Sequence, residues 1–127
     1  MPTAVITGAT AGLGRGFADA FARRGFDLVL VARDEQRLGE AAAELEGAFG
    51  VHCEVFAADL AERAQVDQLA ARVSDPQRPI HALVNNAGFG LRSPFTRTGV
   101  EDEQRLLDVM VTAVMRLTHA ALPAMVE

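Results

Sequence analysis

The stretch Thr7 to Gly14, TGATAGLG, places three glycines between a short apolar run and a segment with helical periodicity. The run before it, AVIT at 4–7, is apolar and β-branched, which is typical of a buried strand. Apolar residues after the turn recur at helical spacing and stop at Gly25, which predicts one buried helix face: Leu13, Phe17, Ala20, Phe21 and Ala22. A glycine turn at a helix N-terminus exposes backbone N–H groups, and the helix dipole favours an anion there. The stretch therefore predicts a strand, an anion-binding turn and the start of a helix.

The same strand–helix unit recurs along the chain. Uninterrupted apolar residues at 27–32 predict a strand buried on both faces of a parallel sheet. Alternation at 51–58 predicts an edge strand, and a fourth strand is expected at 80–84. Strands that alternate with helices without a linker predict an α/β fold, a single domain over residues 1–127 with a parallel sheet.

The helices that join these strands carry their apolar residues on one side. Asp34 is placed to cap the helix after the second strand. That helix and the next one should each bury an apolar face: Leu38, Ala41, Ala42 and Leu45, then Val66, Leu69, Ala70 and Val73. A loop at 85–99 and one long helix at about 100–126 complete the chain, giving four helices for four strands.

Composition narrows the classes of function. The net charge is −5 and the seventeen acidic residues are spread along the chain, which argues against nucleic acid as a partner. The single cysteine, Cys53, allows no internal disulfide and has no neighbouring metal ligands, so we expect it to be a buried apolar residue. No apolar run approaches the roughly 20 residues that cross a bilayer, and no basic leader precedes the first strand. We therefore expect a cytoplasmic protein that binds no metal, membrane or nucleic acid.

Polar or small residues follow three of the strands, at the edge of a parallel sheet where ligands bind. Arg33 follows the second strand, and its planar guanidinium suits the 2′-phosphate of NADP. Asp34 beside it offers the alternative of a hydrogen bond to the free ribose hydroxyl of NAD, although capping is its favoured role. Asp59 follows the third strand and NNAG at 85–88 the fourth; taken singly, these are typical of a helix cap and a turn. The cofactor predicted from these residues is NADP in preference to NAD.

The combination of these segments is more specific than any one of them. The glycine spacing is GxxxGxG, which differs from the GxGxxG of the usual dinucleotide fingerprint and lacks the Lys-Ser/Thr of a P-loop. In order along the chain, TGATAGLG, Ala32-Arg33, Ala58-Asp59-Leu60 and LVNNAG at 83–88 resemble the short-chain dehydrogenase/reductase family. The resemblance covers essentially all of the chain. It implies a Rossmann-like, doubly wound parallel sheet with strand order 3-2-1-4, truncated relative to the full family fold.

The resemblance also implies how the chain holds a nicotinamide dinucleotide. The pyrophosphate and the adenosine ribose would contact the glycine turn, through Gly8, Thr10, Gly12, Leu13 and Gly14. Arg33 would hold the 2′-phosphate, and Asp59 would meet the adenine amino group beside the Leu60 backbone. The ribose side would be lined, and the sheet braced, by Asn86, Ala87 and Gly88.

The catalytic residues that the resemblance implies are not found in this sequence. Family members transfer a hydride between the nicotinamide and a carbonyl or alcohol carbon with Ser, Tyr and Lys, supported by an Asn. This chain has twelve arginines but no tyrosine and no lysine, so we assign no residue to catalysis. Met110 stands at the usual asparagine position, and we interpret it as a core gap-filler.

Two hypotheses of function follow. The first is the NADP-binding portion of an oxidoreductase, as a truncated product or a fragment; the second is a non-catalytic NADP-binding or interaction protein derived from the same fold. A methyl-donor-binding α/β domain shares the layout, but Arg33 stands where such a domain is expected to have an acid.

The last helix is apolar almost all round. One apolar face suffices to cover a sheet, so a second one predicts a further layer. In the family this helix packs against another subunit, and an unpaired strand at 80–84 would also favour association. We therefore expect a homo-oligomer formed through the helix at 100–126.

Overall fold

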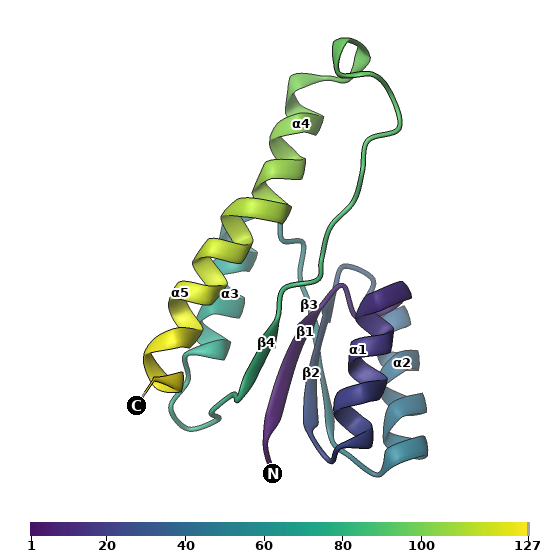
Figure 1. The fold of residues 1–127 in the computed structure, drawn as a ribbon, viewed down its shortest axis with the longest axis vertical. Coiled ribbons are helices and arrows are strands. Elements are labelled where there is room, and N and C mark those ends of the chain that lie inside the picture. The colour runs from purple at the N-terminus through teal and green to yellow at the C-terminus, as the bar shows by residue number, and fades with distance from the viewer. Residues whose placement is uncertain (127) are drawn as a thin grey trace.

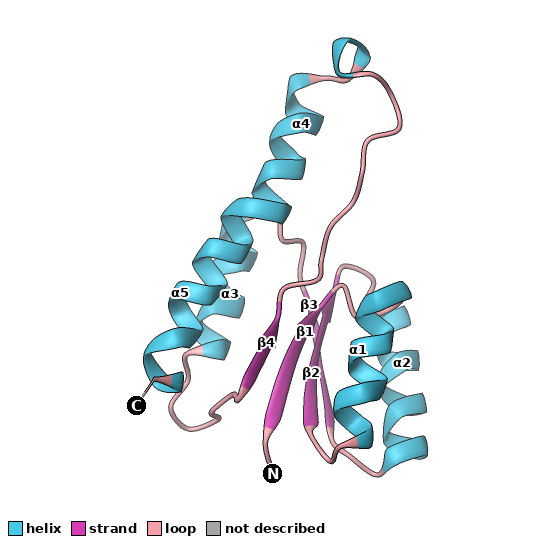
Figure 2. Cartoon of the chain, viewed as in Figure 1, coloured by secondary structure: helices cyan, strands magenta, loops and turns pink. Residues whose placement is uncertain are grey.

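The computed structural model describes residues 1–126 and has three layers (Figure 1). A parallel sheet lies in the middle, α1 and α2 cover one face, and α3 and α5 cover the other (Figure 2). The elements in chain order are β1 (Thr3–Thr7), α1 (Gly12–Arg23), β2 (Asp27–Ala32), α2 (Glu35–Phe49), β3 (Cys53–Ala57), α3 (Arg63–Val73), β4 (Ala82–Val84), a 3-10 turn (Phe95–Arg97), α4 (Val100–Leu107), a π-helical turn (Asp108–Thr112) and α5 (Ala113–Met125).

The sheet confirms the predicted topology. Its order is β3-β2-β1-β4 and every neighbouring pair is parallel. β4 is shorter than expected and begins at Ala82. Ile80 is buried in the core, and His81 contacts Thr3 of β1 twice: its N–H donates to the Thr3 carbonyl, and its ring Nδ1, in place of a backbone carbonyl, accepts the Thr3 N–H. The carboxyl ends of all four strands face the same edge, where the loops that follow them gather (Figure 2).

Successive residues of the inner strands point to opposite faces, so each strand feeds two cores. On one face Ala4, Ile6, Leu28 and Leu30 pack with α1 and α2. On the other face Val5, Val29 and Val31 pack with α3 and α5. This double burial is the reason why these strands are continuously apolar in sequence. The predicted inner faces of α2 and α3 are also found, with Ala70 only partly buried.

The predicted inner face of α1 is wrong in part. Of the predicted residues, Leu13, Phe17 and Ala20 are exposed, the first two at 77% and 42% of their surface, and Ala22 is buried as expected. The buried residues of the helix are Gly14, Ala18 and Ala22. These three lie four residues apart and form a flat, small-residue surface on the helix. The short side chains allow α1 to lie close against β1, and this contact leaves the larger apolar residues on the outer side.

The C-terminal helix runs without interruption from α4 through the π turn into α5. Its buried residues recur every four positions, at Val109, Ala113, Leu117 and Ala121, and they pack on the sheet and α3. The helix is nevertheless long and apolar enough to cross a bilayer, which corrects the expectation that no segment approaches that length. Only two charged residues, Asp108 and Arg116, interrupt residues 106–122. One face of the helix is buried against the sheet and α3, and only 22% of its most apolar 18-residue window is buried.

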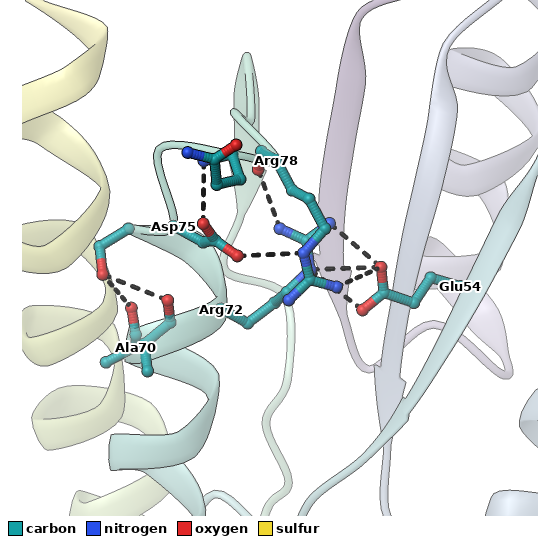
Figure 3. Close-up of polar contacts among 8 residues, drawn as sticks. Glu54, Ala70, Arg72, Asp75 and Arg78 are labelled. Atoms are coloured by element: carbon teal, nitrogen blue, oxygen red, sulfur yellow. Dashed lines mark hydrogen bonds and ion pairs between the residues drawn. The ribbon is translucent and has the colours of Figure 1, made fainter.

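A buried arginine ties the end of α3 to the edge strand β3 (Figure 3). Arg72 is 7% exposed and donates to both carboxylate oxygens of Glu54, and its Nη1 donates to the backbone carbonyl of Arg78. Arg78 in turn pairs with Asp75 at 3.1 Å. Burial of the guanidinium is tolerated because its donors are satisfied. The cluster holds the turn between α3 and β4 at the sheet edge opposite the loops that follow the strands.

Replacement of Gly14 by alanine should destabilise the protein. A Cβ at this position would collide with the backbone carbonyl of Gly8 and lie 2.6 Å from Asn86 Nδ2, so α1 would have to move. We expect G14A to lower the free energy of unfolding by about 2 kcal/mol or more, measured by urea denaturation.

Gly16 provides the matched control, because a Cβ there meets no atom within 4 Å. G16A should stabilise the helix by about 0.5–1 kcal/mol. Equal effects of the two substitutions would contradict the close approach of α1 to β1.

Candidate functional site

A cavity of about 610 Å³ lies at the carboxyl edge of the sheet. The ends of β1, β2 and β3, the loop after β4, and α4 with the π turn all contribute to its wall, so it draws on segments from Gly8 to Val109. Its volume is within the range of sites that hold a cofactor or a small ligand. Its charged residues are Arg33, Asp34, Arg37, Asp59 and Arg105.

The glycine turn forms one end of this cavity. Gly8 and Gly12 have φ angles of +66° and +58°, which side-chain-bearing residues rarely adopt. Ala11 caps α1 without a side-chain hydrogen bond, so no side chain among the described residues caps the N–H groups of the first helical turn. Free N–H groups at a helix N-terminus bind anions. The predicted turn therefore has two left-handed glycines and leads into a helix start without a side-chain cap, and anion binding there stays a prediction.

A hydroxyl group joins this turn to the loop after β4. Thr7 is 1% exposed, and its Oγ1 accepts hydrogen bonds from the backbone N–H groups of Asn86 and Ala87, both at 2.9 Å. Asn86 Nδ2 donates to the Gly8 carbonyl at 3.3 Å, and Asn85 Nδ2 donates to Thr118 Oγ1 on α5 at 3.2 Å. Two strand ends and α5 are thereby held in one arrangement.

Two arginines occupy the wall beside β2. Arg33 and Arg37 both line the cavity, and within residues 1–126 neither forms an ion pair with an acid. Asp34 lies between them, and its Oδ1 accepts the Arg37 backbone N–H at 3.1 Å, as expected for a cap. This part of the cavity therefore presents two arginines against the single carboxylate of Asp34, and the net positive charge suits a phosphate group.

Asp59 follows β3, the strand next to β2, and is held by Arg105 of α4. Its carboxylate accepts the Ala61 backbone N–H at 3.0 Å and pairs with Arg105 Nη2, at 3.1 Å from Oδ1 and 2.9 Å from Oδ2. Burial alone would raise the pKa of Asp59, but the Ala61 hydrogen bond, Arg105 and the charge of Arg33 together hold this pKa below its usual value. Asp59 is therefore a carboxylate that accepts hydrogen bonds. It is not the cap of α3, because the residue before that helix is Glu62.

Met110 lies beside the cavity, which corrects its interpretation as a core gap-filler. It is 44% exposed, and a Cβ placed on Gly88 would come within 3.3 Å of its Cε. The π turn at Asp108–Thr112 contains Met110 and displaces its side chain from the buried face. Gly88 is thus covered on one side by a thioether.

The predicted binding residues separate into two groups. Seven line the cavity: Gly8, Thr10, Arg33, Asp59, Leu60, Ala87 and Gly88. The other four do not line it. Gly12 and Leu13 are exposed at the start of α1, and Gly14 and Asn86 contact the Gly8 backbone of the turn. Sequence reasoning missed Thr7, Arg37 and Arg105. Of these, only Arg37 had a sequence indication, its position one helical turn after Arg33.

No group of three or more His, Cys, Asp or Glu residues that could hold a metal ion occurs within residues 1–126. Cys53 is buried as expected, and burial, with the charge of Glu46 adding to it, raises the pKa of its thiol to about 11. A thiol with this pKa is a poor nucleophile at neutral pH.

The chain matches the family model for short chain dehydrogenases over residues 2–127. It belongs to this family. Among curated relatives, very-long-chain 3-oxoacyl-CoA reductase from Mycosarcoma maydis is 39% identical over 98% of this chain and 36% of the relative. Sulfoacetaldehyde reductase 2 from Chromohalobacter salexigens is 36% identical over 97% of this chain and 48% of the relative. The chain thus spans between a third and a half of these short-chain dehydrogenase relatives.

Solved structures of the family share the fold described above. A short-chain dehydrogenase from Sphingobium yanoikuyae in complex with NADPH superposes with a TM-score of 0.94 and 42% identity, covering 99% of this chain and 49% of that one. L-sorbose reductase from Gluconobacter frateurii, complexed with NADPH and L-sorbose, superposes with a TM-score of 0.89 and 37% identity, covering 98% and 47%. The chain therefore has the N-terminal half of a family fold that binds nicotinamide dinucleotides.

The Thr7 hydroxyl should be required for the arrangement of the two loops. In T7V the side chain keeps its shape but leaves the N–H groups of Asn86 and Ala87 buried without an acceptor, at a cost of about 2–4 kcal/mol in the free energy of unfolding. T7S keeps the oxygen and loses one methyl group, at a cost of about 1 kcal/mol. Thermal and urea denaturation would measure both, and equal stability of the two variants would show that the hydroxyl is unimportant.

Proposed function

We propose that this chain binds NADP(H) in the cavity at the carboxyl edge of the sheet, as the cofactor-binding part of a short-chain oxidoreductase. The observation that carries the proposal is the pair Arg33 and Arg37, which lack an acidic partner within residues 1–126 and face the same cavity as the glycine turn. A phosphate on the adenosine ribose of NADP would neutralise them, whereas NAD has no group that does so.

The residues present fit the cofactor along its length. The uncapped start of α1 and the positive-φ glycines suit the pyrophosphate, because no Cβ at Gly12 blocks an approaching group. Arg33 and Arg37 suit the 2′-phosphate, and Asp59 with Leu60 suits the adenine. Ala87 and Gly88 line the end of the cavity next to Met110 and would contact the nicotinamide ribose. Bound NADPH supplies a hydride to a carbonyl carbon.

Cofactor preference tests the proposal directly. We expect the purified chain to bind NADPH at least about tenfold more tightly than NADH, in titrations followed by calorimetry or nicotinamide fluorescence. R33A should remove most of that difference, since one charge-assisted contact to phosphate is worth about 10- to 100-fold in affinity. R24A is the matched control, because Arg24 follows the far end of α1 and does not line the cavity. An NADH affinity equal to that for NADPH, or no binding of either at millimolar concentration, would refute the proposal.

A non-catalytic role is the second candidate, and Met110 favours it. A thioether at the asparagine position cannot donate a hydrogen bond to an ordered water. A protein of this kind would bind NADPH without oxidising it in the presence of carbonyl compounds. The two candidates share the cofactor site and differ only in turnover.

We also propose that the chain forms homo-oligomers through the outer face of α4 and α5. Leu107, Val111, Met115 and Leu122 are between 46% and 57% exposed, and their spacing of four, four and seven residues places them on one side of the helix. An apolar strip of this kind on a helix that already buries its other side favours association with a second copy.

Analytical ultracentrifugation should detect this association. We expect the wild-type chain to sediment as a dimer or larger species, and V111E/M115E to shift it toward monomer while the cooperative melt is kept. A43E, at an exposed position of α2 on the other face of the sheet, serves as a control for added negative charge. A wild-type chain that sediments as a single monomeric species would contradict the proposal.

A further inference from the structure

The side chain of Arg105 connects α4 to the carboxyl edge of the sheet through an ion pair with Asp59. α4 buries no residue of its own. Its side-chain hydrogen bonds to Thr98 and Asp108 are to neighbours within five positions in sequence, whereas Arg105 donates to the distant Asp59 after β3. The two residues are 46 positions apart in sequence and both line the cavity. Their side chains are partly exposed, at 34% and 25%, so the pair is accessible from the cavity.

The contacts leave one side of the Asp59 carboxylate available. Oδ1 accepts from the Ala61 N–H and from Arg105 Nη2, whereas Oδ2 accepts only from Arg105. Each carboxylate oxygen has two acceptor sites, so Oδ2 retains one. Because the pair with Arg105 fixes the rotation of the carboxylate, this free acceptor site has a defined direction.

The charges around Asp59 keep it ionised. Arg33 after β2 and Arg105 on α4 both act on it, and the remaining charged residues of the cavity are Asp34 and Arg37 at the start of α2. An ionised carboxylate only accepts hydrogen bonds, so it attracts an N–H donor and repels a carbonyl oxygen. A base with an exocyclic amino group fits this site, and a base with a carbonyl group at the same position does not.

We propose that Arg105 is a positioning residue for base recognition: by holding Asp59 from α4, it aims the carboxylate at the amino group of an adenine ring and makes the site reject a 6-oxo purine. The inference rests on the proposed binding of NADP(H) and adds the residue that sets the base preference. If Arg105 served only to anchor α4, its loss would lower the affinity for every cofactor by the same factor.

The experiment compares two cofactors that differ only in the base. The full chain is titrated by calorimetry with NADPH and with its reduced hypoxanthine analogue, in which an oxygen replaces the 6-amino group. We expect the wild-type chain to prefer NADPH by about tenfold, the value of one charge-assisted hydrogen bond. R105L should reduce this preference by more than about threefold, and R105K, which keeps the charge without the planar fork, should retain part of it.

Two further variants sharpen the result. D59N should lose the preference as well, and the double variant R105L/D59N should lose no more than D59N alone, because both residues act through one contact. R116L is the matched control: Arg116 on α5 pairs with Asp67 on α3 at 2.9 Å, in the same kind of pair, but lies outside the cavity lining.

The possible results distinguish a failure of the role of Arg105 from a failure of the proposed NADP(H) binding. A wild-type chain that binds neither cofactor refutes the proposed function and this inference with it. A chain that binds NADPH but shows no base preference, or a preference that R105L and R105K leave unchanged, overturns the role of Arg105 alone. Loss of the preference for NADPH over the hypoxanthine analogue in R105L and D59N, with an unchanged preference in R116L, supports the role of Arg105.

Discussion

No side chain fits where the start of α1, the end of β1 and the loop after β4 meet. Gly14 lies against the Gly8 carbonyl and beside Asn86, so even a methyl group would force these segments apart. This close approach lets α1 lie along β1 on its small residues. It also places the free N–H groups of the first helical turn at the cavity, because the helix begins directly above the strand end. Thr7 Oγ1 then holds the β4 loop to the same point through two hydrogen bonds. The cavity depends on this junction, since two of the segments that line it, the glycine turn and the loop after β4, meet there.

Electrostatics at the cavity differ from those of the whole chain. The protein carries a net charge of −5, yet the cavity wall has three arginines and two aspartates. Asp34 is engaged in capping α2, and Asp59 is paired with Arg105. Three arginines against two aspartates leave one net positive charge, so an acidic protein has a locally positive cavity wall. The same arrangement leaves an acceptor site free on Oδ2 of Asp59.

The sequence predicted the layout well and the packing of single helices less well. Strand order, parallel pairing and the two-sided burial of β1 and β2 could be predicted from motifs and apolar runs that are visible in the sequence. The inner face of α1 did not follow, because hydrophobicity favoured Leu13 and Phe17, whereas the space above β1 admits only glycine and alanine. Met110 was misplaced for a similar reason: an apolar residue in an apolar helix predicts burial, and the π turn that displaces it leaves no sequence pattern that we recognised.

The sequence by itself determined the fold, the anion-binding turn and the identity of the residues after each strand. These are local properties, since periodicity, glycine conformation and chain order each depend on neighbouring residues. The tertiary structure alone decided which distant residues meet. Arg105 and Asp59 come together across 46 positions, and Thr7 reaches Asn86 across 79, because the parallel sheet brings all carboxyl ends to one edge and the last helix rises over it. Contacts between segments so far apart depend on how the layers pack, and no pattern along the chain records that packing.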